Sequence, residues 1–181
     1  MHIDNAIKGR RSIRKYQDRD VQDSVLHELL DLARYAPSSL NGQPWQFVIV
    51  KDQQTKRRLV EIKQAHCPVN KRHYAPAFLE HAPVVLIVCV DRKTSYDREI
   101  ENGMLATANI MLAAHGRGLG SVCMTAYANH DSELSKEVQY LLALPEDIMP
   151  ITIIPLGYPA EMPETKPLTS LEQMIHHELY R

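Results

Sequence analysis

The sequence predicts a globular protein of mixed helices and strands, and three observations support this. The chain has 181 residues, a length typical of one domain or of two very small ones. Hydrophobic residues make up 44% of it and charged residues 24%, which is the ordinary balance of a protein with a buried core. Segments with the apolar period of helices are separated by short apolar runs that favour buried strands.

Local signals predict five helices. Asp4 can cap a short first helix that ends at Gly9. A second helix begins at Asp20, carries apolar residues at i, i+3 and i+4, and stops before Pro37. The pattern of apolar residues predicts three more, over residues 53–66, 99–115 and 132–142. Apolar residues lie on most sides of the helix at 99–115, so we expect it to be buried or to lie at a subunit interface.

Four strands are expected, over residues 46–51, 83–90, 121–127 and 150–158. The second is a continuous run of Val, Leu and Ile, and such a run is typical of a strand that is buried on both faces. Four of the eleven prolines lie between Pro155 and Pro167, which excludes a helix there and favours an extended arm. A short helical segment over residues 168–180 is expected to follow. Such an arm either crosses a neighbouring surface or stays loose.

Composition argues against several classes of protein. The longest uncharged apolar run, residues 82–90, is far shorter than the about 20 residues that span a bilayer. The N-terminal residues lack the apolar stretch of a signal peptide. Three cysteines at wide spacings suggest neither a disulfide framework nor a metal site. We therefore expect a cytoplasmic protein with no membrane partner and no bound metal.

The segment from Lys8 to Arg19 is strongly basic. It contains six basic residues and one acid, in a chain whose formal net charge is −1. If the segment is extended, Arg10, Ser12 and Arg14 share one face along about 13 Å. Two guanidinium groups and a hydroxyl on one line suit an elongated anionic ligand that carries a phosphate. A solvated charged surface is the plain alternative, and nucleic acid is not expected because no aromatic residues are interleaved.

Two further clusters stand out. Residues 36–45 form a polar loop between a helix and a strand, and loops on rigid elements often bind ligands. The loop can equally be a simple turn with Trp45 in the core. Gly116, Gly118 and Gly120 follow a helix instead of a strand, so they are not a dinucleotide fingerprint. They form either a helix cap with a tight turn or a place where a flat ligand approaches the backbone closely.

Taken together and in order, these motifs resemble those of the nitroreductase family of flavin mononucleotide (FMN) enzymes, over nearly the whole chain. The motifs are Arg10-Arg-Ser-Ile-Arg14, Ala36-Pro-Ser-Ser-x-Asn-x-Gln-Pro-Trp45, Gly118-Leu-Gly120, and Leu156-Gly-Tyr-Pro-Ala-Glu161 with Lys166-Pro167. The resemblance implies an α+β fold with a central, mostly antiparallel sheet flanked by helices. It also implies a single domain over residues 1–181 in an intertwined homodimer, whose C-terminal arm, residues 158–181, extends onto the partner subunit.

The resemblance implies a role for each motif in binding FMN at the dimer interface. Arg10 would hold the phosphate, Ser12 would contact the flavin or ribityl region, and Arg14 would stabilise charge at the pyrimidine edge of the ring. Lys166 would be a second phosphate contact. The backbone at Gly118 and Gly120 would pass close to the cofactor. The other residues assigned to the site are Arg11 and Gln43, together with four that the partner subunit would supply: Pro37, Ser38, Ser39 and Asn41.

The implied activity is that of an FMN-dependent NAD(P)H oxidoreductase. It would use NADH or NADPH to reduce nitroaromatics, quinones or similar small acceptors by a ping-pong mechanism, with no catalytic acid or base from the protein. Two alternatives stay open. One is another chemistry of the same superfamily, either reductive dehalogenation or flavin fragmentation. The other is a flavin-binding or sensing protein with little turnover.

Overall fold

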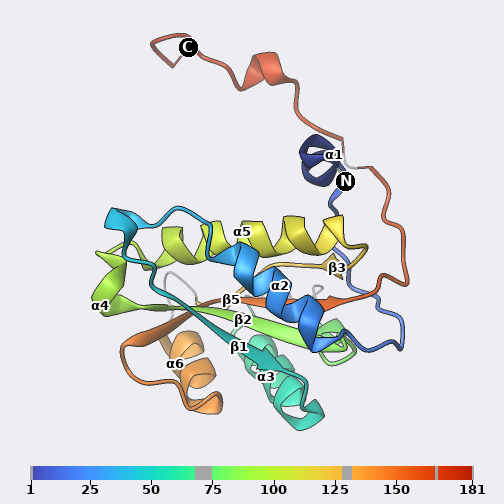
Figure 1. Ribbon diagram of the computed structural model, residues 1–181, viewed down its shortest axis with the longest axis vertical. Coiled ribbons are helices and arrows are strands. Elements are labelled where there is room, and N and C mark those ends of the chain that lie inside the picture. Colours follow the sequence, from blue (N-terminus) through green and yellow to red (C-terminus); the bar gives the residue numbers. More distant parts are fainter. Residues whose placement is uncertain (1, 68–74, 128–131, 166, 181) are drawn as a thin grey trace.

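The centre of the protein is an antiparallel sheet (Figure 1). The computed structural model describes residues 2–67, 75–127, 132–165 and 167–180. Within them, β1 (Trp45–Val50), β2 (Val84–Asp91), β5 (Ile148–Gly157) and β3 (Gly120–Ser121) lie in the order β1-β2-β5-β3, and β4 (Met124–Thr125) also pairs with β5. All four pairings are antiparallel, which confirms the predicted central sheet.

Strand β2 is buried along nearly its whole length because helices cover both faces of the sheet. Its even-numbered residues, such as Leu86 and Val88, belong to one core cluster, and its odd-numbered residues, such as Ile87 and Cys89, belong to another. Burial raises the pKa of the Cys89 thiol to about 12, as expected for a cysteine in an apolar core. The continuous apolar run thus correctly predicted a strand buried on both sides.

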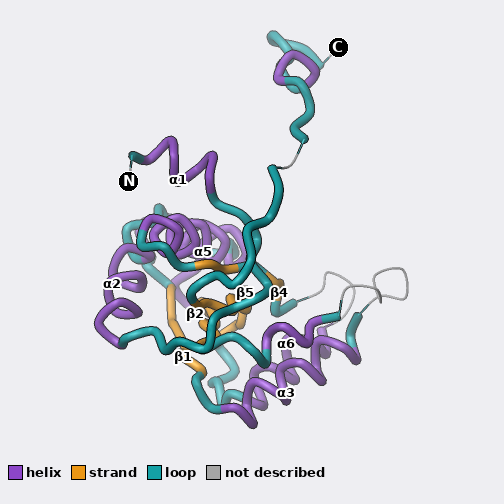
Figure 2. Tube along the Cα trace, turned by 90° about the vertical axis from the view of Figure 1, so that its right-hand side faces the viewer, coloured by secondary structure: helices purple, strands orange, loops and turns teal. Residues whose placement is uncertain are grey.

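Two helices cover each face of the sheet (Figures 1 and 2). On one side lie α2 (Asp23–Ala33) and α5 (Glu99–Gly116), and on the other lie α3 (Gln53–Ala65) and α6 (Ser132–Leu141). Helix α2 begins three residues later than the sequence predicted. Val21, two residues before it, is fully buried in the core, and Gln22 is extended, so the chain is not yet helical where the helix was expected to begin.

The ends of the chain differ more from the sequence prediction. Helix α1 (Ile3–Gly9) is confirmed, but its N-cap is His2, whose side chain accepts a hydrogen bond from the Asp4 backbone. The strand expected at 121–127 is split into β3 and β4. The helix expected at 168–180 is wrong: within the described residues this segment holds only the 3-10 turn Leu171–Gln173. The arm runs away from the body in Figure 1, and a short segment without packing partners does not sustain a helix.

Helix α5 is buried on the side that faces the sheet, where Ala106, Ile110 and Ala114 are fully covered. Near its start it also exposes Ile100, Met104 and Leu105, each 37–42% accessible in the single chain. This division agrees with the apolar pattern that suggested burial or an interface. No helix in the described part of the chain is long and apolar enough to cross a membrane.

Candidate functional site

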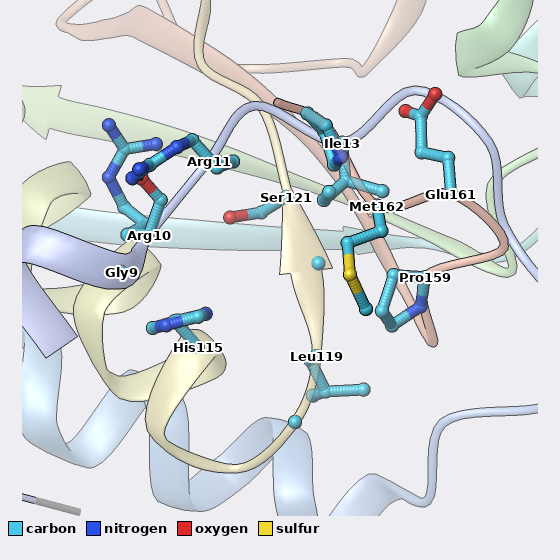
Figure 3. Close-up of a pocket in the computed structure, with 13 residues that line it drawn as sticks. Gly9, Arg10, Arg11, Ile13, His115, Leu119, Ser121, Pro159, Glu161 and Met162 are labelled. Carbon is cyan, nitrogen blue, oxygen red and sulfur yellow. The ribbon is translucent and has the colours of Figure 1, made fainter. Parts of the chain in front are cut away.

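A cleft of about 370 Å³ lies beside the C-terminal end of α5 (Figure 3). Three segments that are distant in the sequence form it: the end of α1 with residues 10–13, the last turn of α5 with the turn into β3, and the arm after β5. Its volume is within the usual range for ligand sites. The lining residues are Gly9, Arg10, Arg11, Ile13, His115, Gly118, Leu119, Gly120, Ser121, Pro159, Glu161, Met162 and Pro163.

The two arginines that follow α1 bring positive charge to this cleft. Nη1 of Arg10 is buried and has no hydrogen-bond partner, and the same is true of Nε of Arg11. The other end of Arg11 is engaged, because its Nη1 donates to the carbonyls of Lys8, at 2.7 Å, and of Arg10, at 3.0 Å. The Arg11 side chain therefore bonds carbonyls at the C-terminal end of α1. Arg10, in contrast, has a buried donor without an acceptor. Such a donor is costly unless a ligand supplies the acceptor.

The glycine turn between α5 and β3 borders the cleft. Gly118 has φ +76°, which favours glycine, and its N–H donates to the His115 carbonyl at 3.0 Å. No atom lies within 4 Å of the place where a Cβ of Gly118 would stand. A Cβ on Gly120, in contrast, would lie 2.7 Å from Cγ1 of Ile13. The helix cap and tight turn are thus confirmed, and Gly120 is required for packing against Ile13, while the backbone at Gly118 is open.

The segment from Arg10 to Arg14 does not present the single face that its alternation predicted. Ser12 forms one isolated bridge with Ser121, and the Ile13 N–H donates to the Ser121 carbonyl at 3.1 Å. Because the pairing stops there, the segment is not a regular strand. Arg10 and Arg11 line the cleft, and Ser12 and Arg14 are not among its lining residues. The guanidinium carbon of Arg14 lies 5.8 Å from the centre of the Phe78 ring instead.

Glu161 fixes this segment from the arm. Its Oε1 accepts hydrogen bonds from the backbone N–H groups of Arg14, at 2.5 Å, and Lys15, at 3.1 Å. The Ala160 N–H donates to the Lys15 carbonyl at 2.9 Å, so the two segments run side by side here. Sequence reasoning recognised the motif that ends in Glu161 but gave it no role. It also missed His115 and Met162, which line the cleft; the proximity of His115 to the glycine turn was the available signal.

The polar loop lies at the opposite end of α5. It contains the 3-10 turn η1 (Ser39–Asn41), whose Ser39 N–H donates to Oδ1 of Asn102 at 3.0 Å. Trp45 is buried in the core, and its indole N–H donates to the Asn102 carbonyl at 2.8 Å. Asn102 and His115 are thirteen residues apart on α5, or about 20 Å along its axis. Within one chain the structure therefore does not bring the loop to the cleft.

The remaining residues that the sequence assigned to the site lie in the polar loop or in the arm. The loop residues Ser38, Asn41 and Gln43 bond one another, with the Gln43 N–H donating to Oγ of Ser38 at 3.0 Å and its side-chain amide to the Asn41 carbonyl at 3.4 Å. Pro37 is exposed beside them. Lys166 lies outside the described residues. No group of three or more metal-binding side chains occurs in the part of the chain that the structure describes.

Comparisons with known proteins agree with the sequence motifs. The family model of the nitroreductase family matches residues 7–158. A protein of Methanothermobacter thermautotrophicus, provisionally named NADH dehydrogenase/NAD(P)H nitroreductase, is 37% identical over 98% of this chain and 87% of its own. An iodotyrosine deiodinase of Thermotoga neapolitana is 31% identical over 84% and 86%.

Solved structures show the same fold. The FMN-dependent nitroreductase of Clostridium difficile R20291 superposes with a TM-score of 0.82, at 27% identity, over 97% of this chain and 99% of that one. The family match spans most of the chain and includes the arginine segment, the polar loop and the glycine turn. This chain belongs to the nitroreductase family.

Proposed function

We propose that this protein uses NADH or NADPH to reduce nitroaromatics, quinones or similar small acceptors by a ping-pong mechanism. Its family makes it an oxidoreductase, and relatives named NAD(P)H nitroreductase and FMN-dependent nitroreductase support FMN as cofactor and NAD(P)H as co-substrate. The observation that carries the proposal is the buried Nη1 of Arg10, which has no hydrogen-bond partner and belongs to a residue that lines the cleft.

The residues of the cleft fit the phosphate end of FMN. A buried donor without an acceptor costs about 1–3 kcal/mol, and a phosphate oxygen would remove this cost. A guanidinium also matches phosphate with two parallel hydrogen bonds. Arg10 would therefore hold the phosphate, with the charge of Arg11 behind it and the open backbone at Gly118 beside it. Gly120 would keep Ile13 and the turn in contact.

The rest of the segment would hold the flavin. Ser12 would contact the flavin or ribityl region, and Arg14 would lie at the pyrimidine edge. When bound, FMN would accept hydride from NAD(P)H and pass electrons to the acceptor. Arg14 would stabilise negative charge on the reduced ring, and Glu161 would hold the Arg14 backbone in place through its hydrogen bond. No side chain of the protein needs to donate or remove a proton in this scheme.

A homodimer would complete the site. The loop residues Pro37, Ser38, Ser39, Asn41 and Gln43 are about 20 Å from the cleft along α5 of the same chain, so a second chain would have to supply them. Two exposed apolar regions support this assembly. One is on α5, at Ile100, Met104 and Leu105; the other is the arm, at Leu168, Leu171, Met174, Ile175 and Leu179. The arm would lie on the partner subunit, and Lys166 within it would be a second phosphate contact.

Reductive dehalogenation is the second candidate, because the iodotyrosine deiodinase of T. neapolitana is 31% identical over most of both chains. The Arg10 cleft would serve either chemistry, since both need the same cofactor phosphate to be held. The residues that distinguish acceptors would lie over the flavin ring instead.

A turnover assay tests the proposed function. The purified holoprotein is mixed with NADH or NADPH, and oxidation of the nucleotide is followed with a nitroaromatic, a quinone, an iodinated phenol or no acceptor. We expect a yellow protein whose NAD(P)H oxidation accelerates with the nitroaromatic or the quinone. Acceleration by the iodinated phenol alone would favour dehalogenation. An FMN-loaded protein that no acceptor accelerates would contradict an enzymatic role and favour a flavin-binding or sensing protein.

A further inference from the structure

His115 lies in the last turn of α5, and its imidazole lines the cleft with Arg10 and Arg11 (Figure 3). The ring rests against the end of α1: a Cβ added to Gly9 would lie 2.9 Å from Nε2 of His115. Because Gly9 has no side chain, there is room for the imidazole at this position. Packing alone does not require a titratable ring beside two half-buried arginines, each of which has one buried nitrogen without a hydrogen-bond partner.

The surroundings of the imidazole favour its neutral form. Burial lowers the pKa of His115 below its ordinary value, and the positive charges of Arg10 and Arg11 lower it further. The other charged groups nearby have contacts elsewhere or are exposed. Glu161 of the arm bonds the backbone of Arg14 and Lys15.

The remaining charges lie on α1 and at the end of α5. Lys8 on α1 is exposed. Arg117, just after α5, is paired with Glu28 of α2 at 3.0 Å. The carbonyl groups at the C-terminal end of a helix carry partial negative charge, opposite in sign to these cations. By itself, the end of α5 is therefore an unfavourable place for an anion. Arg10 and Arg11 offset that charge, and a third cation beside them would do so more completely.

We propose that His115 takes up a proton when the phosphate of FMN enters the cleft, and then donates a hydrogen bond to it. This inference rests on the proposed function, because it assumes that FMN is the ligand. A phosphate with two negative charges reverses the balance around the ring. The imidazolium becomes a third cation on the phosphate, with Arg10 and Arg11. Retention of the cofactor is then coupled to pH through a residue that does not touch the flavin ring.

The direction of the coupling follows from linkage. Without ligand the pKa of His115 is lowered, and the bound phosphate raises it. Between the two values the free site is neutral and the occupied site is protonated, so binding consumes a proton. At a pH above the pKa of His115 in the occupied site, His115 therefore adds nothing to FMN affinity. Its contribution grows as the pH falls toward the pKa of His115 in the free site. It amounts to on the order of tenfold in Kd for each unit of separation.

Calorimetric titration of the apoprotein with FMN tests this coupling. Two buffers of different ionisation enthalpy give the number of protons taken up at each pH. His115→Gln keeps a polar side chain of similar reach but cannot gain a proton, and His27→Gln, at an exposed position on α2, is the matched control. FMN itself titrates near pH 6, but all variants share that contribution, so the difference between proteins isolates His115.

We expect the wild type and His27→Gln to take up more protons than His115→Gln. The affinity ratio of wild type to His115→Gln should be about tenfold or more near pH 6 and close to one near pH 8.5. Riboflavin, which lacks the phosphate, should bind the three proteins equally at every pH. Gly9→Ala, which crowds the ring, should reduce the proton uptake as well.

Two failures are distinguishable. Equal proton uptake by wild type and His115→Gln, with tight FMN binding by both, would overturn the role of His115 and leave the proposed function intact. Failure of the wild type to bind FMN at any pH would overturn the proposed function itself. If His115→Gln does not fold, unchanged proton uptake in Gly9→Ala would count against the inference in its place.

Discussion

Oε1 of Glu161 accepts a hydrogen bond from the backbone N–H of Arg14 at 2.5 Å, across 146 intervening residues. This contact, with a second one to Lys15, joins the arm after β5 to the segment that borders the cleft. Glu161→Ala leaves the partly buried N–H of Arg14 and the exposed N–H of Lys15 without this acceptor, so the free energy of unfolding should fall by about 1–3 kcal/mol, mostly through Arg14. FMN affinity should fall with it. Thermal melts and FMN titration measure both quantities.

Glu161→Gln and Glu164→Ala are the matched controls for this prediction. A glutamine side chain still offers a carbonyl oxygen to both N–H groups, so most of the stability and affinity should remain. Glu164 is exposed on the same arm, and its loss should change neither quantity. If Glu161→Ala bound FMN as tightly as Glu164→Ala does, Glu161 would not position the segment.

The glycine turn offers a comparison within five residues. Gly118→Ala forces a side chain into a left-handed conformation, at a cost of about 1–2 kcal/mol. Gly120→Ala should be worse, because the added Cβ would meet Ile13 at 2.7 Å. Gly116→Ala meets no atom within 4 Å and ends a helix, so it should be neutral or stabilising by up to about 1 kcal/mol. Chemical denaturation of the three variants would rank them, and a different order would contradict the account of the turn.

Much of the fold could be predicted from local sequence, where local signals and tertiary packing agree. The pattern of helix α3 and the apolar run of β2 gave their bounds to within one residue. The errors occur where tertiary contacts, and not local sequence, determine whether a segment is helical. Val21 belongs to the core and delays the start of α2. The tail after Pro167 was expected to be helical from its composition, but a single chain gives it no surface to pack on.

The candidate site was less predictable than the fold. Arg10 and Gly118 were found because they lie in short, ordered motifs. Glu161 lies in a recognised motif and His115 lies beside the glycine turn, but their roles were missed because their contacts are with residues more than 100 positions away, which these local patterns do not encode. The alternation that placed Ser12 beside Arg10 assumed a regular strand, whereas the segment pairs at one bridge only.

Dimer formation is tested by shortening the arm. A chain that ends after Pro163 keeps Glu161 and the lining of the cleft but loses the exposed apolar residues of the tail. We expect weaker dimers, measured by sedimentation, and faster loss of FMN on dilution. A full-length double variant, Leu171→Asp with Met174→Asp, should behave in the same way because both residues are exposed in the single chain. A truncated protein that stays a tight, yellow dimer would contradict the proposed place of the arm.

The potential of the bound flavin tests the role of Arg14. If its charge stabilises the reduced, anionic ring, Arg14→Ala should lower the midpoint potential by about 30–60 mV, the equivalent of a partly buried charge interaction. NAD(P)H should then reduce the flavin more slowly, and reoxidation should be unimpaired. Redox titration and stopped-flow half-reactions measure these changes.

Arg14→Lys distinguishes charge from packing in the same experiment. An ammonium keeps the charge but not the planar fork, so it should recover only part of the potential. If Arg14 only packs near Phe78, both variants would lose stability and leave the potential of a fully loaded flavin unchanged.

The most direct test of the central claim, that the cleft beside α5 holds the phosphate of FMN through Arg10, is a paired titration with FMN and riboflavin. Lys8→Ala, at an exposed position two residues before Arg10, controls for a general loss of positive charge. Arg10→Ala should weaken FMN by about tenfold to a hundredfold, the equivalent of a charged hydrogen bond, and leave riboflavin binding nearly unchanged. Equal losses for both ligands, or no loss for either, would show that the phosphate binds elsewhere.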